Sequence, residues 1–341
     1  MADTLRPILD AYLAGGVPPN IALMRLCIEA GSPEALRATL DGARARLGDS
    51  EPNALSLSRV GEGQGEGSAL SEGGRSSPHP SPARERGPVA LPAPGPKAER
   101  LAALSSLLDQ HGSAWATVRA VMAEAEHDRG SASADQAVAH WSVVFDRLAR
   151  TQPEAGVALY ALGSPELLEQ ATAEIVESLR GWALIDSATA VLEIGCGIGR
   201  FVRALAPEVA QVAGVDVSRE MIARAGERCA GLANVRLAVS SGRDLAAFGD
   251  GSFDLVLAAD VFPYLVQAGD GLAARHVAEA ARVLRPGGTL AILNYSYRGD
   301  PDRDRRELAA HAAASGFAAV EEPRPAFRHW DGSVFLLRTA G

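Results

Sequence analysis

The chain has little cysteine, and its three cysteines form no pattern typical of a bound metal or a disulfide framework. Cys27, Cys196 and Cys229 include no Cys-x-x-Cys pair, and the histidines do not cluster. A structural zinc site needs several such ligands at short spacing, and a disulfide-rich secreted domain needs a denser, even set. We therefore expect no metal site, no disulfides and a reducing compartment.

An excess of positive charge and long apolar runs are also missing. The formal net charge is −9, whereas a nucleic-acid partner would need a basic face. No apolar run approaches the roughly 18–20 residues that span a bilayer. The first ten residues lack the basic start and apolar stretch of a signal peptide. These absences predict a cytoplasmic protein that binds neither nucleic acid nor membrane, as a monomer or a homodimer.

Apolar residues make up 47% of the 341 residues, which is enough for a substantial core, and their spacing divides the chain. Residues 1–48 and 98–135 have apolar residues at helical spacing and predict a small all-α N-terminal region. Residues 49–97 are rich in Gly, Ser and Pro and have almost nothing to bury, which predicts a disordered low-complexity linker or insertion. Two interpretations stay open. The segment is either a translated intergenic repeat, of a kind found in bacterial genomes, within one helical unit, or a tether between independent domains.

Residues 136–341 change to strands that alternate with helices. The predicted strands are 189–194, 211–216, 235–239, 253–259 and 289–295, followed by a hairpin of 317–321 and 333–339. Such alternation implies a parallel sheet with helices on both faces, and the hairpin adds antiparallel strands. The predicted fold class is therefore α/β, a doubly wound, mostly parallel seven-stranded sheet with a C-terminal antiparallel hairpin, preceded by the all-α region.

Residues 191–200, Val-Leu-Glu-Ile-Gly-Cys-Gly-Ile-Gly-Arg, are the most informative stretch. Gly195, Gly197 and Gly199 follow an apolar strand, which is how a buried parallel strand ends in a turn whose backbone approaches a ligand closely. Asp216 ends the next predicted strand, and an acid at this place in a βαβ unit binds the ribose hydroxyls of an adenosine cofactor. The alternative for Asp216 is a helix cap.

These two motifs, followed by Ala-Arg-Val-Leu-Arg-Pro-Gly-Gly-Thr-Leu at 281–290, resemble the class I S-adenosylmethionine (SAM) dependent methyltransferases over roughly residues 140–340. Dinucleotide binding, the nearest alternative, would need a glycine at position 200 or 202, where Arg200 and Val202 stand. The resemblance implies an enzyme that transfers a methyl group from SAM to an oxygen, nitrogen or carbon of a small molecule by in-line displacement. A protein methyltransferase that recruits its target through the N-terminal helices, and a non-catalytic SAM-binding interaction protein, remain as alternatives.

The resemblance implies a cofactor site around the first three strands. The glycine loop is expected to offer N–H donors, and Glu193 or a water that it holds is expected to meet the ammonium group of SAM. Many relatives place an acid and a small residue against the adenine after the third strand, but Ser241 and Gly242 occupy those positions, so the acid is missing. Asp244, three residues after Ser241, is the alternative acid. The predicted cofactor-binding residues are Glu193, Gly195, Cys196, Gly197, Gly199, Asp216, Val217, Ser241, Gly242 and Asp260.

Asp260 and Tyr264 follow the fourth strand, and ligands of such sheets bind at the carboxyl ends of the strands. We predict that these two residues are catalytic and lie beside the transferred methyl group; the alternative is that Asp260 caps the next segment and Tyr264 packs as a wall. Amine methyltransferases that act on nucleic acids or glutamine carry Asp/Asn-Pro-Pro-Tyr here. The Asp-x-x-Pro-Tyr of residues 260–264 argues against that subclass.

Four residues are predicted to bind the substrate: Tyr160, Tyr295, Tyr297 and Arg298. The last three follow the fifth strand, where two tyrosines and an arginine suit a polar or anionic substrate, unless they are a solvated strand end. Tyr160 lies in a segment that resembles the helices covering the cofactor in small-molecule methyltransferases, unless it is plain core. His276, within a predicted helix beside apolar residues, is interpreted as packing or surface rather than as a base.

Overall fold

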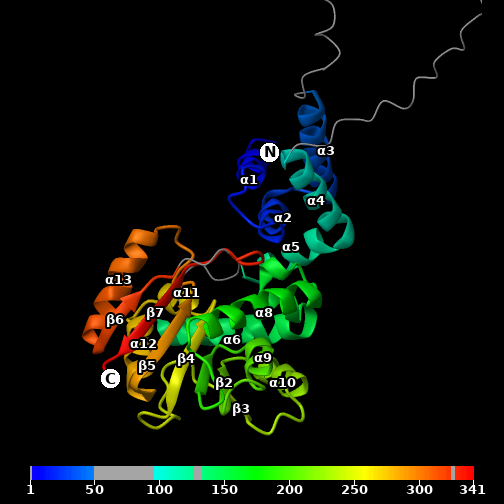
Figure 1. Cartoon of the computed structure of the whole chain (residues 1–341). Coiled ribbons are helices and arrows are strands. Elements are labelled where there is room, and N and C mark those ends of the chain that lie inside the picture. Colours follow the sequence, from blue (N-terminus) through cyan, green and yellow to red (C-terminus); the bar gives the residue numbers. More distant parts are fainter. Residues whose placement is uncertain (1, 50–95, 126–132, 324–326) are drawn as a thin grey trace, which may run out of the picture.

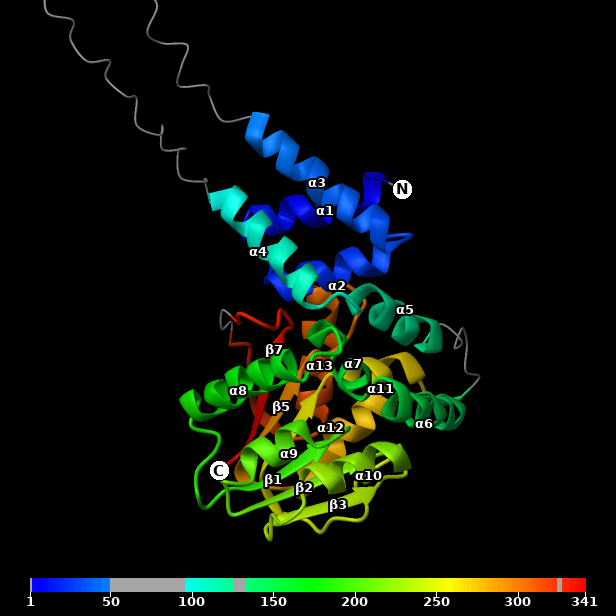
Figure 2. The same ribbon diagram turned by 90° about the vertical axis from the view of Figure 1, so that its right-hand side faces the viewer.

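The structure is a computed structural model that describes residues 2–49, 96–125, 133–323 and 327–341. A group of helices lies at one end of an α/β body, as Figures 1 and 2 show from two directions. Apart from its ends, the predicted linker 49–97 falls outside the described residues, so its disorder stays a prediction.

Five helices form the N-terminal group, and α2 lies at its centre, in contact with α1, α4 and α5. Their bounds are α1 (Ala2–Leu13), α2 (Pro19–Glu29), α3 (Pro33–Asp49), α4 (Pro96–Gln110) and α5 (Ala114–Ala125). Leu26 and Leu36, before the gap, share one core with Leu104 and Val118, after it. The helices on both sides of residues 50–95 therefore pack as one unit, which favours an insertion over a tether.

The sheet has seven strands in the order β3-β2-β1-β4-β5-β7-β6. Their bounds are β1 (Ala190–Ile194), β2 (Gln211–Asp216), β3 (Val235–Val239), β4 (Phe253–Ala259), β5 (Leu284–Leu293), β6 (Phe317–Glu321) and β7 (Val334–Thr339). The first five strands run parallel, while β7 pairs antiparallel with both β5 and β6. This topology confirms the predicted fold class. Strands β2 and β3 are added on one side of β1, and β4 and β5 are added on its other side. Ligands of such folds bind at this switch point between β1 and β4.

Helices cover both faces of the sheet (Figure 2). They are α6 (Ala134–Thr151), α7 (Pro153–Val157), the 3₁₀ helix η1 (Leu159–Ala161), α8 (Pro165–Gly181), α9 (Arg200–Leu205), α10 (Arg219–Arg228), α11 (Phe262–Ala268), α12 (Leu272–Val283) and α13 (Pro301–Ala314). Alternate strand residues face opposite sides. Val191 packs into the core with α8 and α9, and Leu192 packs into the core with α12 and α13. The first of these cores continues into the N-terminal helices, so the helical group and one face of the sheet share one apolar interior.

The observed elements differ from the expected ones in one helix and in several boundaries. Helix α11 follows β4 where no helix is predicted, and α6 begins at Ala134, so the predicted domain boundary at residue 136 falls in its first turn. Strand β5 spans 284–293 instead of 289–295. It ends early because Asn294 takes a left-handed backbone conformation with φ of 64°, which an extended strand does not allow.

Two negative findings hold for the described part of the chain. Within it, no helix combines the length and the apolar content needed to cross a membrane. The same residues include no group of His, Cys, Asp and Glu side chains that is arranged to hold a metal ion.

Candidate functional site

A cavity of about 890 Å³ opens where the parallel strands end. Its floor consists of residues that directly follow the strands, namely Gly195 and Gly197 after β1, Asp216 and Val217 at β2, Ser240 and Gly242 after β3, Asp260 and Val261 after β4, and Asn294 after β5. Its other walls come from α2, α5, α6, α7, η1, α10, α11 and α12 and from residues 330–333 before β7. The cavity thus lies between the sheet and both sets of preceding helices.

The glycine loop forms part of this floor, and all three glycines have positive φ: 67° at Gly195, 51° at Gly197 and 74° at Gly199. A Cβ on Gly195 would overlap the Val261 side chain, and one on Gly197 would lie 2.5 Å from a methyl carbon of Val157 in α7. Gly199 does not line the cavity, because it packs against α10, where a Cβ would lie 3.0 Å from the Cβ of Ala225. Two of the three glycines therefore border the ligand space, and the third serves helix packing.

Asp216 lies on the cavity floor with both carboxylate oxygens held. Oδ2 accepts a hydrogen bond from the backbone N–H of Gly197 at 2.9 Å, and Oδ1 accepts one from the N–H of Ser218 at 2.8 Å. Burial raises the pKa of Asp216 to about 6, against the opposing effect of these hydrogen bonds. The cap of α10 is Ser218, whose hydroxyl accepts from the N–H of Met221. Asp216 therefore braces the glycine loop and keeps lone pairs free for a ligand.

Glu193 and Cys196 lie beneath the loop and do not line the cavity. The Glu193 side chain is buried and its Oε2 has no hydrogen-bond partner among the described residues. Burial raises the pKa of Glu193 to about 8, although the Arg200 guanidinium acts to lower it. Cys196 donates its backbone N–H to the carbonyl of Val215, and burial raises the pKa of its thiol. The two residues support the loop from below.

The loop after β3 closes one end of the cavity. Ser240 and Gly242 line it, and a Cβ on Gly242 would lie 2.6 Å from a methyl carbon of Val217. Ser241, a predicted cofactor residue, does not line the cavity: it is exposed, and its hydroxyl accepts from the N–H of Arg243. The period-two alternation of β3 does not continue into this loop, so neighbouring positions after the strand give no guide to which side chain faces inward.

Asp260 lies at the centre of the cavity floor with φ of 57°, a conformation that costs about 1–2 kcal/mol for a residue with a Cβ. Its Oδ1 accepts hydrogen bonds from Asn294 Nδ2 at 2.6 Å and from the Tyr297 hydroxyl at 3.2 Å. Its Oδ2 lies 3.9 Å from Nη2 of the buried Arg200. Burial raises the pKa of Asp260, while Arg200 and the two hydrogen bonds act to lower it. This carboxylate is held in place from three sides.

Aromatic side chains surround Asp260. Tyr264 packs edge-on against Trp141 of α6, with ring centroids 4.6 Å apart, and against Tyr297 at 6.4 Å. Tyr160, from η1, is buried and lines the cavity, and its hydroxyl has no hydrogen-bond partner among the described residues. Burial raises the pKa of Tyr160 to about 12, so this hydroxyl keeps its proton and can donate it. The structure thus brings four predicted site residues from distant segments into one cavity: Tyr160, Asp260, Tyr264 and Tyr297.

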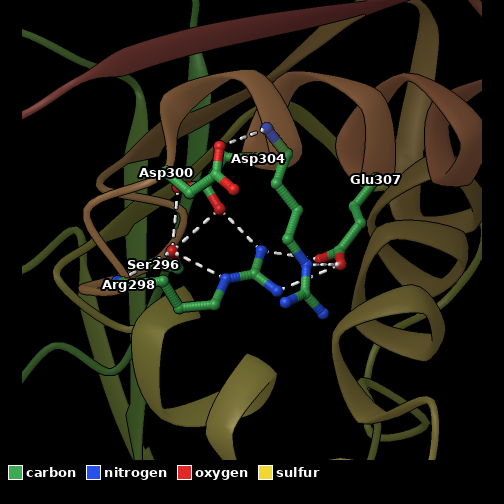
Figure 3. A network of polar contacts seen from close by, with 6 residues as sticks. Ser296, Arg298, Asp300, Asp304 and Glu307 are labelled. Atoms are coloured by element: carbon green, nitrogen blue, oxygen red, sulfur yellow. Dashed lines mark hydrogen bonds and ion pairs between the residues drawn. The ribbon is translucent and has the colours of Figure 1, made fainter.

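Tyr295 and Arg298, two predicted substrate residues, do not line the cavity. Tyr295 is buried in the core that contains α12 and α13, where its ring stacks on that of Phe262 with the ring centroids 5.9 Å apart. Figure 3 shows Arg298 held by Ser296, Asp304 and Glu307. The prediction for these two residues needs correction, because Asn294 ends the strand and turns the chain. Nη2 of Arg298 lies 2.6 Å from Oδ1 of Asp304 and 2.7 Å from Oε2 of Glu307, so its guanidinium is engaged in ion pairs within the protein.

Several residues that line the cavity are not among the predicted site residues. Ile21, Met24, Arg25 and Ile28 of α2, with Val121 and Met122 of α5, form one wall of the cavity. Arg25 pairs with Asp331, which precedes β7, at 2.6 Å. The buried Asn20 of α2 donates to the backbone carbonyls of Tyr160 and His329. Their helical spacing signalled only core packing, so no local pattern could have found this wall.

The parallel sheet, glycine loop and strand-end acid define an α/β protein with a nucleoside-type site. Residues 192–292 match the family model described as a methyltransferase domain, which bears out the resemblance over this part of the chain.

Individual relatives cover parts of the chain. A Synechocystis protein named 2-methyl-6-phytyl-1,4-hydroquinone methyltransferase is 31% identical over 135 residues, which are 38% of this chain and 41% of the relative. Methyltransferase GfsG of Streptomyces halstedii is 31% identical over 178 residues, which are 51% of this chain and 60% of the relative. The chain thus spans about half the length of these curated relatives. Among solved structures, phosphoethanolamine N-methyltransferase 1 of Haemonchus contortus is 23% identical, with a TM-score of 0.43. The match covers 51% of this chain and 35% of the Haemonchus chain.

Proposed function

We propose that this protein transfers a methyl group from SAM to a small molecule with an apolar body. The observation that carries the proposal is a single cavity whose lining includes the glycine loop, Asp216, Asp260 and side chains of α2. Its volume of about 890 Å³ lies near the upper end of the 300–1,000 Å³ of ordinary ligand sites. The cavity therefore has room for a nucleoside cosubstrate and a second molecule.

The residues present fit SAM. Gly195 and Gly197 keep the loop backbone open to the cavity, where a Cβ would collide with covering side chains. Each oxygen of Asp216 accepts a hydrogen bond from one backbone N–H, of Gly197 and of Ser218, and a carboxylate oxygen has two lone pairs for hydrogen bonds. It is therefore able to accept both ribose hydroxyls in addition. The predicted role of Glu193 toward the ammonium group stays a proposal, and its unpartnered Oε2 beneath the loop is what supports it.

When bound, SAM supplies a methyl group that is already activated for displacement. The protein's own part is to place the acceptor in line with that methyl, and orientation alone is worth roughly 7–11 kcal/mol of barrier. Asp260, fixed by Asn294, Tyr297 and Arg200, offers an oxygen to a hydroxyl or amine of the acceptor. The Tyr160 hydroxyl offers a donor. The helices over the cavity exclude water from the reacting atoms.

The α2 and α5 wall indicates the class of acceptor. Its side chains Ile21, Met24, Ile28, Val121 and Met122 are apolar, and its charged member, Arg25, pairs with Asp331. Asp260 is hydrogen-bonded to the polar side chains of Asn294 and Tyr297 in the same cavity. An acceptor with an apolar body and one polar end fits this division. One relative is named 2-methyl-6-phytyl-1,4-hydroquinone methyltransferase, and the acceptor in that name combines an apolar phytyl chain with a hydroquinone.

The same wall bears on the alternative of a protein methyltransferase. Recruitment of a protein would use an outer surface of the N-terminal helices, whereas α2 and α5 place side chains inside the cavity. The helices therefore have an acceptor-binding role available that needs no protein partner.

Two measurements test the proposal. Isothermal titration calorimetry of the full chain should detect binding of SAM and of S-adenosylhomocysteine (SAH); no binding of either at millimolar ligand would overturn it. Incubation with methyl-labelled SAM and fractionated cell extract should then place the label in small, organic-soluble products. Label confined to macromolecules would instead favour the protein methyltransferase, and no transfer despite binding would favour the non-catalytic interaction protein.

A matched pair of variants tests the acceptor wall. Ile28 of α2 lines the cavity and Ile8 of α1 does not, and both are half-buried isoleucines of the N-terminal helices. Ile28→Glu should lower methyl transfer to the organic-soluble product at least about tenfold, since burying an unpaired charge next to an apolar ligand is costly. SAH affinity should be unchanged, and Ile8→Glu should alter neither quantity. Equal transfer by the two variants would show that the wall does not contact the acceptor.

A further inference from the structure

The end of the cavity beyond Asp216 contains a buried histidine. His276 of α12 is 1% exposed and lines the cavity. One turn later on the same helix, Glu279 accepts a hydrogen bond from the backbone N–H of Leu245. Since residues three apart share a helix face, His276 is directed at the loop that follows β3. This is the loop in which Ser240 and Gly242 border the cavity.

The hydrogen bonding of His276 fixes which ring nitrogen is free for a ligand. Its Nδ1 lies 3.0 Å from the carbonyl oxygen of Leu272. A carbonyl oxygen only accepts hydrogen bonds, so Nδ1 carries the proton. Burial lowers the pKa of His276, which favours the neutral ring. In that tautomer Nε2 has a lone pair and acts only as an acceptor.

The position of the base within the cavity follows from Asp216, given the proposed function on which this step rests. The ribose at Asp216 leads to the sulfonium in one direction and to the base in the other. The sulfonium has to face Asp260 and the acceptor wall, so the base extends toward Val217, Gly242 and His276. At this end Gly242 lets Val138 and Val217 pack closely against the loop, because a Cβ there would come within 2.7 Å of a methyl carbon of Val138 and 2.6 Å of one of Val217.

We propose that Nε2 of His276 accepts a hydrogen bond from the exocyclic amino group of the adenine. This contact makes His276 a specificity-determining residue that selects adenosyl ligands over purines without an amino donor. Ser241 and Gly242 offer no acid, and Ser241 does not line the cavity. Asp244, three residues after Ser241, does not line the cavity either, and its Oδ1 accepts a hydrogen bond from the N–H of Ala246. The Ser240 hydroxyl already accepts from the N–H of Gly242 at 3.0 Å. His276 is thus the buried acceptor that the described residues provide at this end.

A functional-group cycle measured by calorimetry tests the proposal. The ligands are SAH and its analogue in which purine without the amino group replaces adenine. Wild type should bind SAH about 2- to 12-fold more tightly than the analogue, the range expected for one neutral hydrogen bond. His276→Phe should bind both ligands equally, and His276→Gln should restore part of the preference because its amide oxygen is an acceptor. His311→Phe, on α13 and outside the cavity lining, should keep the wild-type preference.

Each outcome has one meaning. An unchanged preference in His276→Phe, or a wild-type preference below twofold, would overturn the role of His276 while leaving the proposed function intact. Failure of wild type to bind SAH at all would overturn both. Spectra of ¹⁵N-histidine-labelled wild type give a second readout that requires no variant. The Nε2 resonance of His276 should move when SAH is added and stay when the analogue is added, and the opposite pattern would refute the contact.

Discussion

Replacing Asp216 by alanine is the most direct test of how the floor of the cavity works. The carboxylate is buried and each oxygen accepts one backbone N–H, from Gly197 and from Ser218. A ribose would add two hydrogen bonds to a charged group, each worth about 1.5–3 kcal/mol. Since burial raises the pKa of Asp216 to about 6, part of this energy offsets the cost of keeping the group ionised. We expect a net loss of about 1–3 kcal/mol, which raises the Kd for SAH about 5- to 150-fold.

A control for this variant exists at the opposite ends of the strands, away from the cavity. Asp254, at the start of β4, accepts from the backbone N–H of Ala190 and pairs with Arg285. Asp254→Ala therefore also removes a carboxylate that braces the sheet, but far from the cavity lining. Both variants should unfold at lower urea concentration than wild type, and only Asp216→Ala should lose SAH affinity in calorimetry. Equal affinities of the two variants, within twofold, would refute the assignment of Asp216 to the ligand.

The pH dependence of SAH binding gives the same test without a large change of structure. The ionised carboxylate is the form that accepts hydrogen bonds, and its pKa in the free protein is about 6. SAH affinity of wild type should therefore fall as the pH drops from 7 through about 6. Asp216→Ala should lack this part of the pH dependence, and identical profiles would contradict the reasoning.

Three further predictions concern stability and binding. Glu193 has a folded pKa of about 8 against 4.5 ordinarily, so folding takes up a proton and wild-type stability should fall as the pH rises between those values; Glu193→Gln should remove this slope in urea titrations at pH 5 to 8, and an equal slope would count against it. Gly197→Ala should lower both stability and SAH affinity, because φ is 51° at this position and the added Cβ would meet a side chain of α7. Gly231→Ala, with φ of 85° and open space around it, should cost only the backbone strain of about 1–2 kcal/mol. Thermal unfolding and calorimetry compare the two variants, and equal losses of stability and of SAH affinity in both would argue against the close approach at Gly197. Asn20→Ala leaves two backbone carbonyls without their donor and should cost about 1–3 kcal/mol in urea unfolding, and no change would mean that water replaces the amide.

Local pattern was sufficient for the centre of the fold. Val191 and Leu192 alternate between the two cores as a buried parallel strand requires, and Gly195 takes the left-handed turn that the sequence predicts. Ser218, with its hydroxyl on the N–H three residues later, starts α10 as its residue type favours. These features depend on residues within a few positions of one another, so a sequence displays them directly.

The acceptor end of the site depended on contacts between distant segments. Tyr295 and Tyr297 are two positions apart and would share a face if the strand continued, yet one is buried in the far core and the other reaches Asp260. The cause is Asn294, whose left-handed backbone and paired amide end the strand. Likewise, Ser241 and Gly242 are neighbours of which only the glycine borders the cavity.

The sequence by itself determined the succession of the seven strands along the chain, the glycine loop and the acid at the end of β2, because steric limits on the backbone and the alternation of apolar residues act locally. Only the tertiary structure decided that α2, more than 200 residues before Asp260, forms a wall of the same cavity, and that His276 faces the end beyond Asp216. An apolar side chain has the same pattern whether it meets another side chain or a ligand, and which of the two it meets is set by how whole elements pack.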